Sequence, residues 1–443
     1  MQETAVSKAM DFAKLREPKS EFILSGLAGT GKTTTMVQVI QGLLDMGHRP
    51  AVCAPTGKAA NVINKKQCHV VAGTIHKALS QRPLDALRKI HDRLDEIEAL
   101  RAKGLMTPEI EKEEADLFKD LDRREYSGNH LSFEPKLIED VLDEFTILLF
   151  DESSMIGRDK TYYNLIHPVP LPRIFVGDAA QLPPVKDEPA VDFKKADIHL
   201  TEILRQGSDS GILYYAHQLH KGRVPSMREM GQYGDVNLIP DGGLNTIKGH
   251  EDAQLIVWMN KERHQLVPKM RNARGFDFDR QKFSYLPMVG EQLYIDDNSV
   301  EMRVSRGQIV TVKQDPVYLF NGNRKTRTLN PNPYLCMVHC VDELGRDRAL
   351  KISMTDLMPH PILEDASRDK SVRRFADIEG VKVLNASVIT CHRAQGSEYP
   401  KVFMLGTMMP QGHADWRKWW YTAATRAQKE LVVASYHYMH EGK

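Results

Sequence analysis

The chain has 443 residues, of which 41% are hydrophobic and 27% charged, and its formal net charge is only +1. A chain this long exceeds one ordinary hydrophobic core, so two or more folded units are expected, and the composition excludes disorder along the whole length. No apolar run approaches the roughly 20 residues that span a bilayer, and the polar N-terminus has no signal-peptide core, so we expect a cytosolic protein. Because the net charge is near zero, a nucleic-acid partner would require positive charge gathered into a groove.

Short apolar runs alternate with helical segments along the chain. The run at 21–25 is typical of a buried strand, and from Lys32 to Met46 apolar residues recur at helical spacing until Gly47 ends the helix. Buried strands separated by helices are typical of parallel α/β sheets, and there are enough runs for two such sheets. The further predicted strands are 51–54, 146–150, 174–176, 255–258, 388–390, 402–405 and 431–435.

Two stretches break this alternation. Residues 83–126 are rich in Leu, Ala, Glu, Lys, Arg and Asp, with Gly104 and Pro108 in the middle, which predicts two charged helices in an antiparallel hairpin. A solvated helical insertion without a role of its own is an equally good interpretation. Residues 284–360 instead show short alternating β-type segments separated by turn residues, which predicts a small inserted β-barrel.

Cysteine usage argues against disulfide and zinc chemistry. The five cysteines occupy positions 53, 68, 336, 340 and 391 and include no C-x-x-C pair. Scattered cysteines provide neither a disulfide framework nor the paired thiolates of a structural zinc site. We therefore expect reduced and mostly buried thiols.

Residues 26–33 match the phosphate-loop pattern G-x-x-x-x-G-K-[ST] between a predicted strand and a predicted helix. The glycines let backbone N–H groups approach phosphates, Lys32 can reach the β- and γ-phosphates of ATP, and the Thr33 hydroxyl suits Mg²⁺. The alternative is a chance glycine-rich turn. The residues predicted to hold the nucleotide here are Gly26, Ala28, Gly29, Thr30, Gly31, Lys32, Thr33 and Thr34.

An acidic pair, Asp151 and Glu152, follows the predicted strand at 146–150. At the carboxyl end of such a strand Asp151 would bind the Mg²⁺ shell, and Glu152 would orient or deprotonate the attacking water. Taken alone, an acidic pair after a strand is often only a helix N-cap. Its occurrence downstream of a phosphate loop favours the catalytic interpretation.

Three further side chains fit the chemistry of phosphoryl transfer. Gln181 lies in the segment 177–185, directly after a predicted strand, and its uncharged amide could contact the γ-phosphate or the water. The alternative for this segment is a proline-stiffened turn. Arg205 and Arg426 carry planar guanidinium groups that match the charge on a transferring phosphoryl group, although either one alone is more often a surface residue.

Together with the segments 54–60, 73–77 and 390–398, these motifs resemble those of the superfamily 1 helicases in order, spacing and residue identity. The resemblance is greatest to the RecD-like branch, which includes small phage helicases of the Dda type, and it covers nearly the whole chain except 83–126. It implies two RecA-like cores that bind ATP and Mg²⁺ between them, with single-stranded DNA across their top. For a phage-encoded chain, the host cytoplasm would be the compartment.

Position by position, the resemblance implies the following site residues. Gly396 and Glu398 would contact the nucleotide from the second core, and Gln2 resembles the adenine-reading glutamine, with a disordered terminal residue as the alternative. The implied ATPase residues are Lys32, Thr33, Asp151, Glu152, Gln181, Arg205 and Arg426.

The resemblance also implies a DNA-binding set, since hydroxyls, backbone amides and a few cations suit phosphate contacts without sequence readout. Trp258 could stack on a base, but a tryptophan that ends a buried strand is more often part of the core. His76 could equally be a capping or core residue. The implied DNA contacts are Pro55, Thr56, Lys58, Thr74, His76, Trp258, Asn260, Thr390 and His392.

The chain departs from the branch at one place. Relatives carry a β-hairpin pin between the motif containing His76 and the acidic pair, whereas this chain is predicted to be helical there, which leaves its strand-separating element open. The β-rich insert resembles the SH3-like subdomain of the branch. The expected organisation is a first RecA-like core at 1–80 and 131–204, a helical insertion at 81–130, a second core at 205–283 and 378–443, and an SH3-like β subdomain with linker at 284–377.

The expected function is an ATP-dependent DNA helicase, monomeric, that moves along single-stranded DNA and opens duplex junctions in replication, recombination or repair, with replication or single-strand-binding proteins as partners. The direction 5′ to 3′ follows from the branch, because Gln181 is followed by Leu-Pro-Pro-Val and not by the base-stacking aromatic residue of the opposite branch. The rival functions are an RNA helicase, an NTPase that remodels protein–DNA complexes, a small-molecule kinase, and a nucleic-acid-binding scaffold with an inactive ATPase.

Overall fold

The protein is described by a computed structural model. The described residues are 1–15, 17–66, 70–81, 90, 93–94, 96–98, 100–101, 105–126, 134–203, 209–276, 286–297, 299, 302, 304, 306–322, 329–343, 345–354, 357, 380–406, 413–435 and 439.

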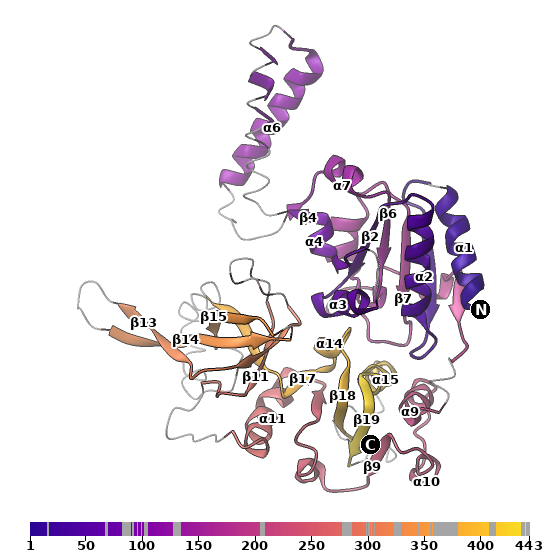
Figure 1. Cartoon of the computed structure of the whole chain (residues 1–443), viewed down its shortest axis with the longest axis vertical. Coiled ribbons are helices and arrows are strands. Elements are labelled where there is room, and N and C mark those ends of the chain that lie inside the picture. The colour runs from indigo at the N-terminus through magenta and orange to yellow at the C-terminus, as the bar shows by residue number, and fades with distance from the viewer. Residues whose placement is uncertain are drawn as a thin grey trace.

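The first core is a six-stranded sheet in which every pairing is parallel, with the strand order β3-β2-β6-β7-β1-β8. Its central strands are buried on both faces, as expected of a parallel sheet covered by helices. Figure 1 shows α1 and α2 along one side of this sheet, α4 on the other side and α7 near one end of the strands. The strands are β1 (Glu21–Gly26), β2 (Pro50–Ala54), β3 (Gly73–Thr74), β6 (Ile147–Phe150), β7 (Arg173–Gly177) and β8 (Ile198–Leu200).

The helices of the first core begin where the sequence supplies caps or small residues. Thr56 and Thr74 accept hydrogen bonds from backbone N–H groups three residues on, and so cap α3 and α4. Helix α1 buries Ala5, Ala9 and Ala13, and this small-residue face lets it lie close against α2. The helices are α1 (Gln2–Leu15), α2 (Lys32–Asp45), α3 (Gly57–Lys65), α4 (Ile75–Leu79) and α7 (Ile138–Glu144), with 3-10 turns at Ser153–Met155 and Phe193–Lys195 and a π-helix at Arg158–Ile166.

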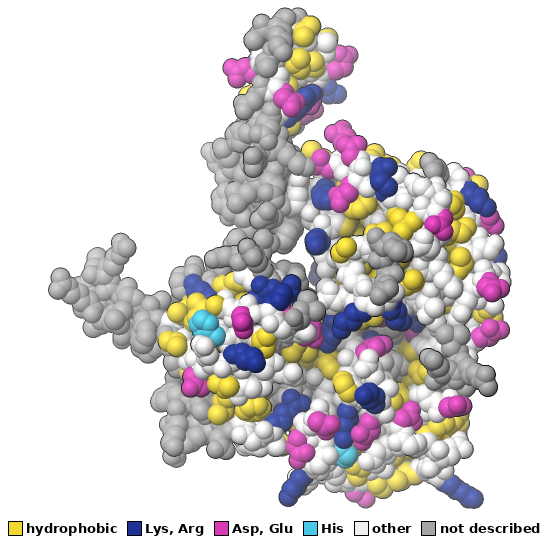
Figure 2. All heavy atoms as spheres, in the orientation of Figure 1, with side chains coloured by type: hydrophobic (Ala, Val, Ile, Leu, Met, Phe, Trp, Pro, Cys, Tyr) yellow, Lys and Arg dark blue, Asp and Glu magenta, His cyan; other side chains and the backbone are white. Residues whose placement is uncertain are grey.

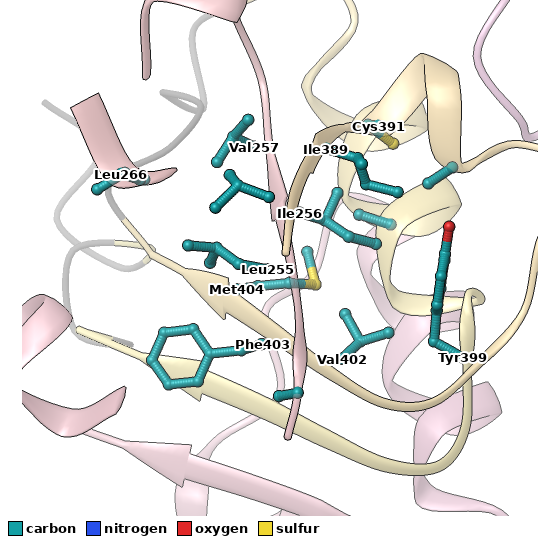
Figure 3. Close-up of a cluster of buried hydrophobic side chains, with 14 of the residues drawn as sticks. Leu255, Ile256, Val257, Leu266, Ile389, Cys391, Tyr399, Val402, Phe403 and Met404 are labelled. Atoms are coloured by element: carbon teal, nitrogen blue, oxygen red, sulfur yellow. The ribbon is translucent and has the colours of Figure 1, made fainter. Parts of the chain in front are cut away.

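The second core is a five-stranded parallel sheet with the order β17-β10-β18-β19-β9. Its apolar centre includes Leu255, Val257, Ile389 and Phe403, whose side chains gather around the strands in Figure 3. The elements are α9 (Gly211–His220), α10 (Met227–Met230), β9 (Val236–Ile239), a 3-10 turn at Gly243–Ile247, β10 (Gln254–Val257), α11 (Asn260–Ala273), β17 (Val388–Thr390), α14 (Cys391–Ala394), β18 (Tyr399–Leu405), α15 (Trp416–Ala424) and β19 (Ala427–Ala434).

A closed β-barrel is inserted into the second core. Five strands close in the order β12-β11-β16-β15-β14 because β12 also pairs with β14, and β13 extends from β14. The barrel was expected to end at residue 377, but its strand β16 lies beyond that boundary, so the expectation was wrong there. The strands are β11 (Gln292–Ile295), β12 (Ile309–Val312), β13 (Val317–Gly322), β14 (Leu329–Asp342), β15 (Asp347–Ser353) and β16 (Val381–Asn385).

The helical insertion projects away from the first core in Figure 1. Its helix α6 (Pro108–Tyr126) follows helical residues described between 90 and 101. Ion pairs join the two segments, since Arg93 lies 2.8 Å from Glu113 and Arg101 contacts Glu114. The segments lie side by side, as the predicted hairpin requires. A two-stranded pairing of β4 (Ser80–Gln81) with β5 (Glu134–Pro135) closes the base of the insertion.

The sequence predicted the interiors of both sheets. Each of the eight predicted strands overlaps an observed strand, and the helix predicted from Lys32 is α2. Of the five cysteines, Cys53, Cys336, Cys340 and Cys391 are buried free thiols, while Cys68 lies outside the described residues. Among the described residues, no helix is both long and apolar enough to cross a membrane.

A buried ion pair fastens the barrel to the second core. Arg271 on α11 lies 2.7 Å from Glu291, which directly precedes β11, and their side chains are only 1% and 4% exposed. Glu291 also accepts hydrogen bonds from Asn385 at the end of β16 and from the backbone of Met288. The carboxylate therefore depends on partners from both units.

We predict that Arg271→Met lowers the free energy of unfolding of the second core by about 3–5 kcal/mol, because it leaves the Glu291 charge buried without its main partner. All four tryptophans lie in this core, so tryptophan fluorescence in a urea titration reports its unfolding. The control is Arg223→Met in the same core, whose guanidinium is half exposed beside Glu229, with an expected change within about 1 kcal/mol. Equal losses in the two variants would contradict a fastening role for the pair.

Candidate nucleotide site and nucleic-acid face

The phosphate loop joins β1 to α2 and has the backbone that its glycines allow. Gly29 and Gly31 have φ values of 83° and 82°, in the left-handed region that side chains disfavour. A Cβ at Gly26 would lie 2.5 Å from the Thr30 hydroxyl. The loop therefore requires glycine at these positions, and loops of this backbone can offer N–H groups to phosphates.

Lys32, the first residue of α2, lies between two acceptors. Its ammonium donates to the backbone oxygen of Leu27 at 3.0 Å and lies 3.5 Å from a carboxylate oxygen of Asp178. The Asp178 side chain is fully buried, and its other oxygen accepts from the N–H of Ala180 at 3.0 Å. A lysine at the mouth of the loop with its charge partly balanced can change partners when phosphates arrive.

The acidic pair lies at the end of β6, as predicted. Asp151 is buried and accepts from the Glu152 N–H at 2.9 Å, and Glu152 adopts a left-handed φ of 48°. Burial raises the pKa of Asp151, and the neighbouring Glu152 charge raises it further. Glu152 has a buried carboxylate oxygen, and Gln181 a buried amide oxygen, that accept no hydrogen bond within the described part of the chain.

The side-chain oxygens of Asp151 and Thr33 fit a magnesium site. The Asp151 carboxylate and the Thr33 hydroxyl are the hard oxygen ligands that Mg²⁺ prefers, and the metal keeps its other positions for water and phosphates. Among the described residues, no group of three or more His, Cys, Asp or Glu side chains is placed to hold a metal ion. When bound, Mg²⁺ would neutralise charge on the β- and γ-phosphates.

The second core reaches the phosphate loop through α9 and α15. The Tyr421 hydroxyl accepts from the Ala28 N–H at 2.7 Å, and a ring nitrogen of His217 lies 3.2 Å from the Ala28 oxygen. The segment after Gln181 is held in the same way, because the Leu182 N–H donates to the Thr422 hydroxyl at 2.9 Å. The candidate nucleotide site is thus an interface between two cores.

Residues expected to contact the nucleotide from the second core lie in several environments. The Arg426 guanidinium is buried and donates to the backbone oxygens of Thr422 at 3.0 Å and Ser397 at 3.3 Å, so it is anchored at the end of α15. Gly396 packs against α3, where a Cβ would lie 3.0 Å from Ala59. Glu398 is exposed and accepts from Gln428 at 2.8 Å. Arg205 lies outside the described residues.

Gln2 is ordered on α1 and contacts the phosphate loop. Its side-chain amide donates to the backbone oxygen of Thr30 at 3.1 Å. This contact places the Gln2 amide beside the loop, where an adenine edge could be read. The adenine contact itself stays a prediction.

The residues predicted to bind DNA follow the carboxyl ends of strands in both cores. Pro55, Thr56 and Lys58 follow β2, Thr74 and His76 follow β3, and the remaining residues end or follow β10 and β17. His76 and Asn260 are exposed, Thr390 is buried, and the other six are half-buried. The Thr56 and Thr74 hydroxyls accept from backbone N–H groups, which leaves each hydroxyl proton available to an acceptor.

Lys58 and Trp258 have structural roles as well. The Lys58 ammonium lies 4.6 Å from the centre of the Tyr399 ring, across the boundary between the cores, and burial lowers its pKa. Trp258 is half-buried, packs against the second core, and makes an edge contact with His413 at 4.8 Å. Asn260 accepts from Arg393 at 2.8 Å. Trp258 therefore contributes to the core of the second unit and keeps part of its ring at the surface.

Sequence reasoning assigned no role to three residues that the structure brings to the site. Asp178 and Tyr421 lie inside segments that were singled out for other residues, and His217 lies in a segment without a predicted function. The signal was present for Asp178, a carboxylate directly after a predicted strand. Nothing in the sequence indicates that Tyr421 and His217 meet at Ala28, because these contacts span 393 and 189 residues.

Comparison with known proteins identifies both cores. An AAA-domain family model matches residues 12–241, just over half of the chain, and a UvrD-like helicase C-terminal domain model matches residues 385–434. The two matched segments contain the phosphate loop, the acidic pair, Gln181 and Arg426. They leave most of the barrel outside.

Among curated proteins, the chain is 27% identical over 230 residues to the ATP-dependent RecD2 DNA helicase of Deinococcus radiodurans, a match that covers 51% of this chain and 25% of that protein. The chain thus spans only a quarter of that relative's length. Among solved structures, it resembles a Pif1 helicase studied for unwinding at forked DNA, with a TM-score of 0.50, 15% identity, and coverage of 97% of this chain and 91% of that one. That likeness concerns the fold alone.

We predict that Glu152→Gln slows ATP hydrolysis about 100-fold or more while ATP affinity changes little, because the amide keeps the shape but cannot accept the proton of the water. Lys32→Ala should instead lose affinity and hydrolysis together. Nucleotide binding and phosphate release are measured separately, with exposed Glu188→Gln as the control. A parallel collapse of affinity and turnover in Glu152→Gln would assign that residue a structural role.

Proposed function

The chain belongs to the AAA-domain family, and from this premise we propose that it is a superfamily 1 helicase of the RecD-like type, an ATP-driven motor that moves along single-stranded DNA and unwinds duplex DNA. The name of the RecD2 relative supports DNA as the substrate and ATP as the fuel. Replication, recombination or repair in the cytosol, or in the host cytosol for a phage protein, would be the setting.

One observation carries the proposal: the phosphate loop is bonded on both sides to the second core. Ala28 contacts Tyr421 and His217, and the segment at Leu182 contacts Thr422. A change in the occupancy of the loop must therefore act on the contact between the cores. A small-molecule kinase with one phosphate-binding core does not need this arrangement, whereas a motor that works by closing and opening a cleft does.

We assign roles to the side chains at this interface. Lys32 would hold the β- and γ-phosphates, Asp151 and Thr33 would hold Mg²⁺, and Glu152 would accept the proton of the attacking water. Gln181 would report whether the γ-phosphate is intact. Arg426 and Arg205 would stabilise charge on the transferring phosphoryl group. Gly396 and Glu398 would contact the nucleotide from the second core, and Gln2 would read the adenine.

The DNA strand would cross both cores along the predicted contact residues. Lys58 and His76 follow the parallel strands β2 and β3 of the first core, and His392 follows β17 of the second. Figure 2 shows Lys and Arg side chains gathered where the two cores meet on the face in view, which suits a phosphate backbone despite the small net charge. Alternate tightening of the two cores would then move the strand.

We predict that single-stranded DNA stimulates ATP hydrolysis and that RNA of the same length and composition does so weakly. Strand binding should depend little on sequence and weaken with salt, with a slope of about −0.7 per neutralised phosphate. Steady-state phosphate release with homopolymers and filter binding across a salt series provide the measurements. Equal or greater stimulation by RNA would favour an RNA helicase, and hydrolysis indifferent to any polynucleotide would favour a kinase-like enzyme.

The direction of movement is proposed from the branch. Gln181 is followed by Leu182 and two prolines instead of a base-stacking aromatic residue, and Leu182 is buried and bonded to the second core through its N–H and its oxygen. The closed barrel in the second core is the second feature shared with the RecD-like branch. Both features favour movement from 5′ to 3′.

We predict that a duplex with a 5′ single-stranded tail is unwound and that one with a 3′ tail is not. The two substrates should share the same duplex and the same tail length, and displacement is followed in a single turnover with excess trap strand. Blunt duplex serves as the control for tail-independent opening. Displacement from the 3′-tailed substrate alone would reverse the proposed direction but leave the ATP-driven motor intact.

A further inference from the structure

Ala28 in the phosphate loop is held from both sides by the second core. Its N–H donates to the Tyr421 hydroxyl at 2.7 Å, and its oxygen lies 3.2 Å from Nε2 of His217. The two second-core rings stack on each other, with centroids 6.2 Å apart and planes inclined by 16°. One residue of the loop therefore touches α9 and α15 at the same time.

The Tyr421 hydroxyl continues into the first core. It donates to a carboxylate oxygen of Asp178 at 2.7 Å, and the same oxygen lies 3.5 Å from the ammonium of Lys32. Tyr421 is fully buried, and burial beside the Asp178 charge raises its pKa well above the usual value, so the phenol is neutral and able to donate. The path Ala28, Tyr421, Asp178, Lys32 begins and ends in the phosphate loop but passes through the second core.

The two ends of this path are groups that bind phosphates. Backbone N–H groups of the loop and the Lys32 ammonium are the donors that a triphosphate recruits. Phosphate oxygens compete with the Asp178 carboxylate for Lys32 and with the Tyr421 hydroxyl for the Ala28 N–H. Nucleotide binding must therefore disturb the partners of Tyr421.

Tyr421 is linked along its helix to the other nucleotide-facing groups. The next residue, Thr422, accepts from the N–H of Leu182 beside Gln181, and its backbone oxygen accepts from the Arg426 guanidinium at 3.0 Å. Because these residues lie within two turns of one helix end, they move together. A displacement of Tyr421 therefore reaches both Gln181 and Arg426.

We propose that Tyr421 is a positioning residue that couples nucleotide occupancy of the phosphate loop to the position of α15, and through it to the affinity of the two cores for DNA. The inference rests on the proposed function, because it needs nucleotide and DNA to bind the same motor. It does not need hydrolysis, since the coupling is a difference in binding free energy between sites and acts equally in both directions.

The experiment measures this coupling directly. The affinity of the full-length protein for a fluorescent non-hydrolysable ATP analogue is determined with and without oligo-dT, and the ratio of the two dissociation constants is the coupling factor. Tyr421→Phe removes only the hydroxyl and with it two hydrogen bonds, to Ala28 and to Asp178. The coupling factor should move toward one by at least about three- to tenfold, the effect of losing one such bond. The matched control is Tyr215→Phe, a buried tyrosine on α9 whose hydroxyl contacts the Met439 sulfur at 3.3 Å.

A second variant tests the other half of the contact. His217→Phe keeps a ring against Tyr421 but removes the nitrogen that faces the Ala28 oxygen, and it should also move the coupling factor toward one. A coupling factor closer to one in Tyr421→Phe, with no change in Tyr215→Phe, supports the inference. A wild-type coupling factor in Tyr421→Phe overturns it. If Tyr421→Phe fails to fold, as judged by circular dichroism, His217→Phe decides by the same criterion.

The outcome can be separated from that of the proposed function. DNA-stimulated ATP hydrolysis by the wild-type protein is measured in parallel, and its absence would refute the motor. A wild-type protein that is stimulated by DNA but shows a coupling factor of one would leave the motor standing and overturn the role of Tyr421.

Discussion

Parallel strands end at the same edge of a sheet, and in the first core three neighbouring strands end in reactive groups. The phosphate loop follows β1, the acidic pair follows β6, and the segment with Asp178 and Gln181 follows β7. Since β1, β7 and β6 are adjacent, no long side chain is needed to bring these groups together. The glycine-dependent loop can then approach Asp178 closely enough for Lys32 to contact its carboxylate.

The same edge also faces the second core, which explains why so many polar groups are buried there. Tyr421, Thr422 and Arg426 come from one helix end and meet first-core backbone or second-core carbonyl groups. Burial of these polar side chains is tolerated because each has a hydrogen-bond partner. The cost of breaking such contacts gives the interface a small number of defined arrangements, which is what a motor requires of its cleft.

The barrel and the helical insertion are joined to the cores by different means. The barrel is fastened by the buried pair of Arg271 and Glu291 and continues the apolar core of the second unit. The insertion instead leaves the first core through the short pairing of β4 with β5, and its two segments are joined by exposed ion pairs such as Arg93 with Glu113. Exposed pairs of this kind add little stability, so the insertion depends on its own helices.

The sequence by itself determined the strand interiors, the phosphate loop and the positions of Lys32, Asp151, Glu152 and Gln181, because local periodicity and short-range motif geometry encode them. It placed Gln2 only by resemblance and ended the barrel too early, since β16 looks like any short apolar strand until its partners are known. Only the tertiary structure decided that Tyr421, His217 and Asp178 meet at the phosphate loop. Such contacts join distant segments. The free energy that selects them comes from packing the two cores together, and local sequence patterns do not predict that packing.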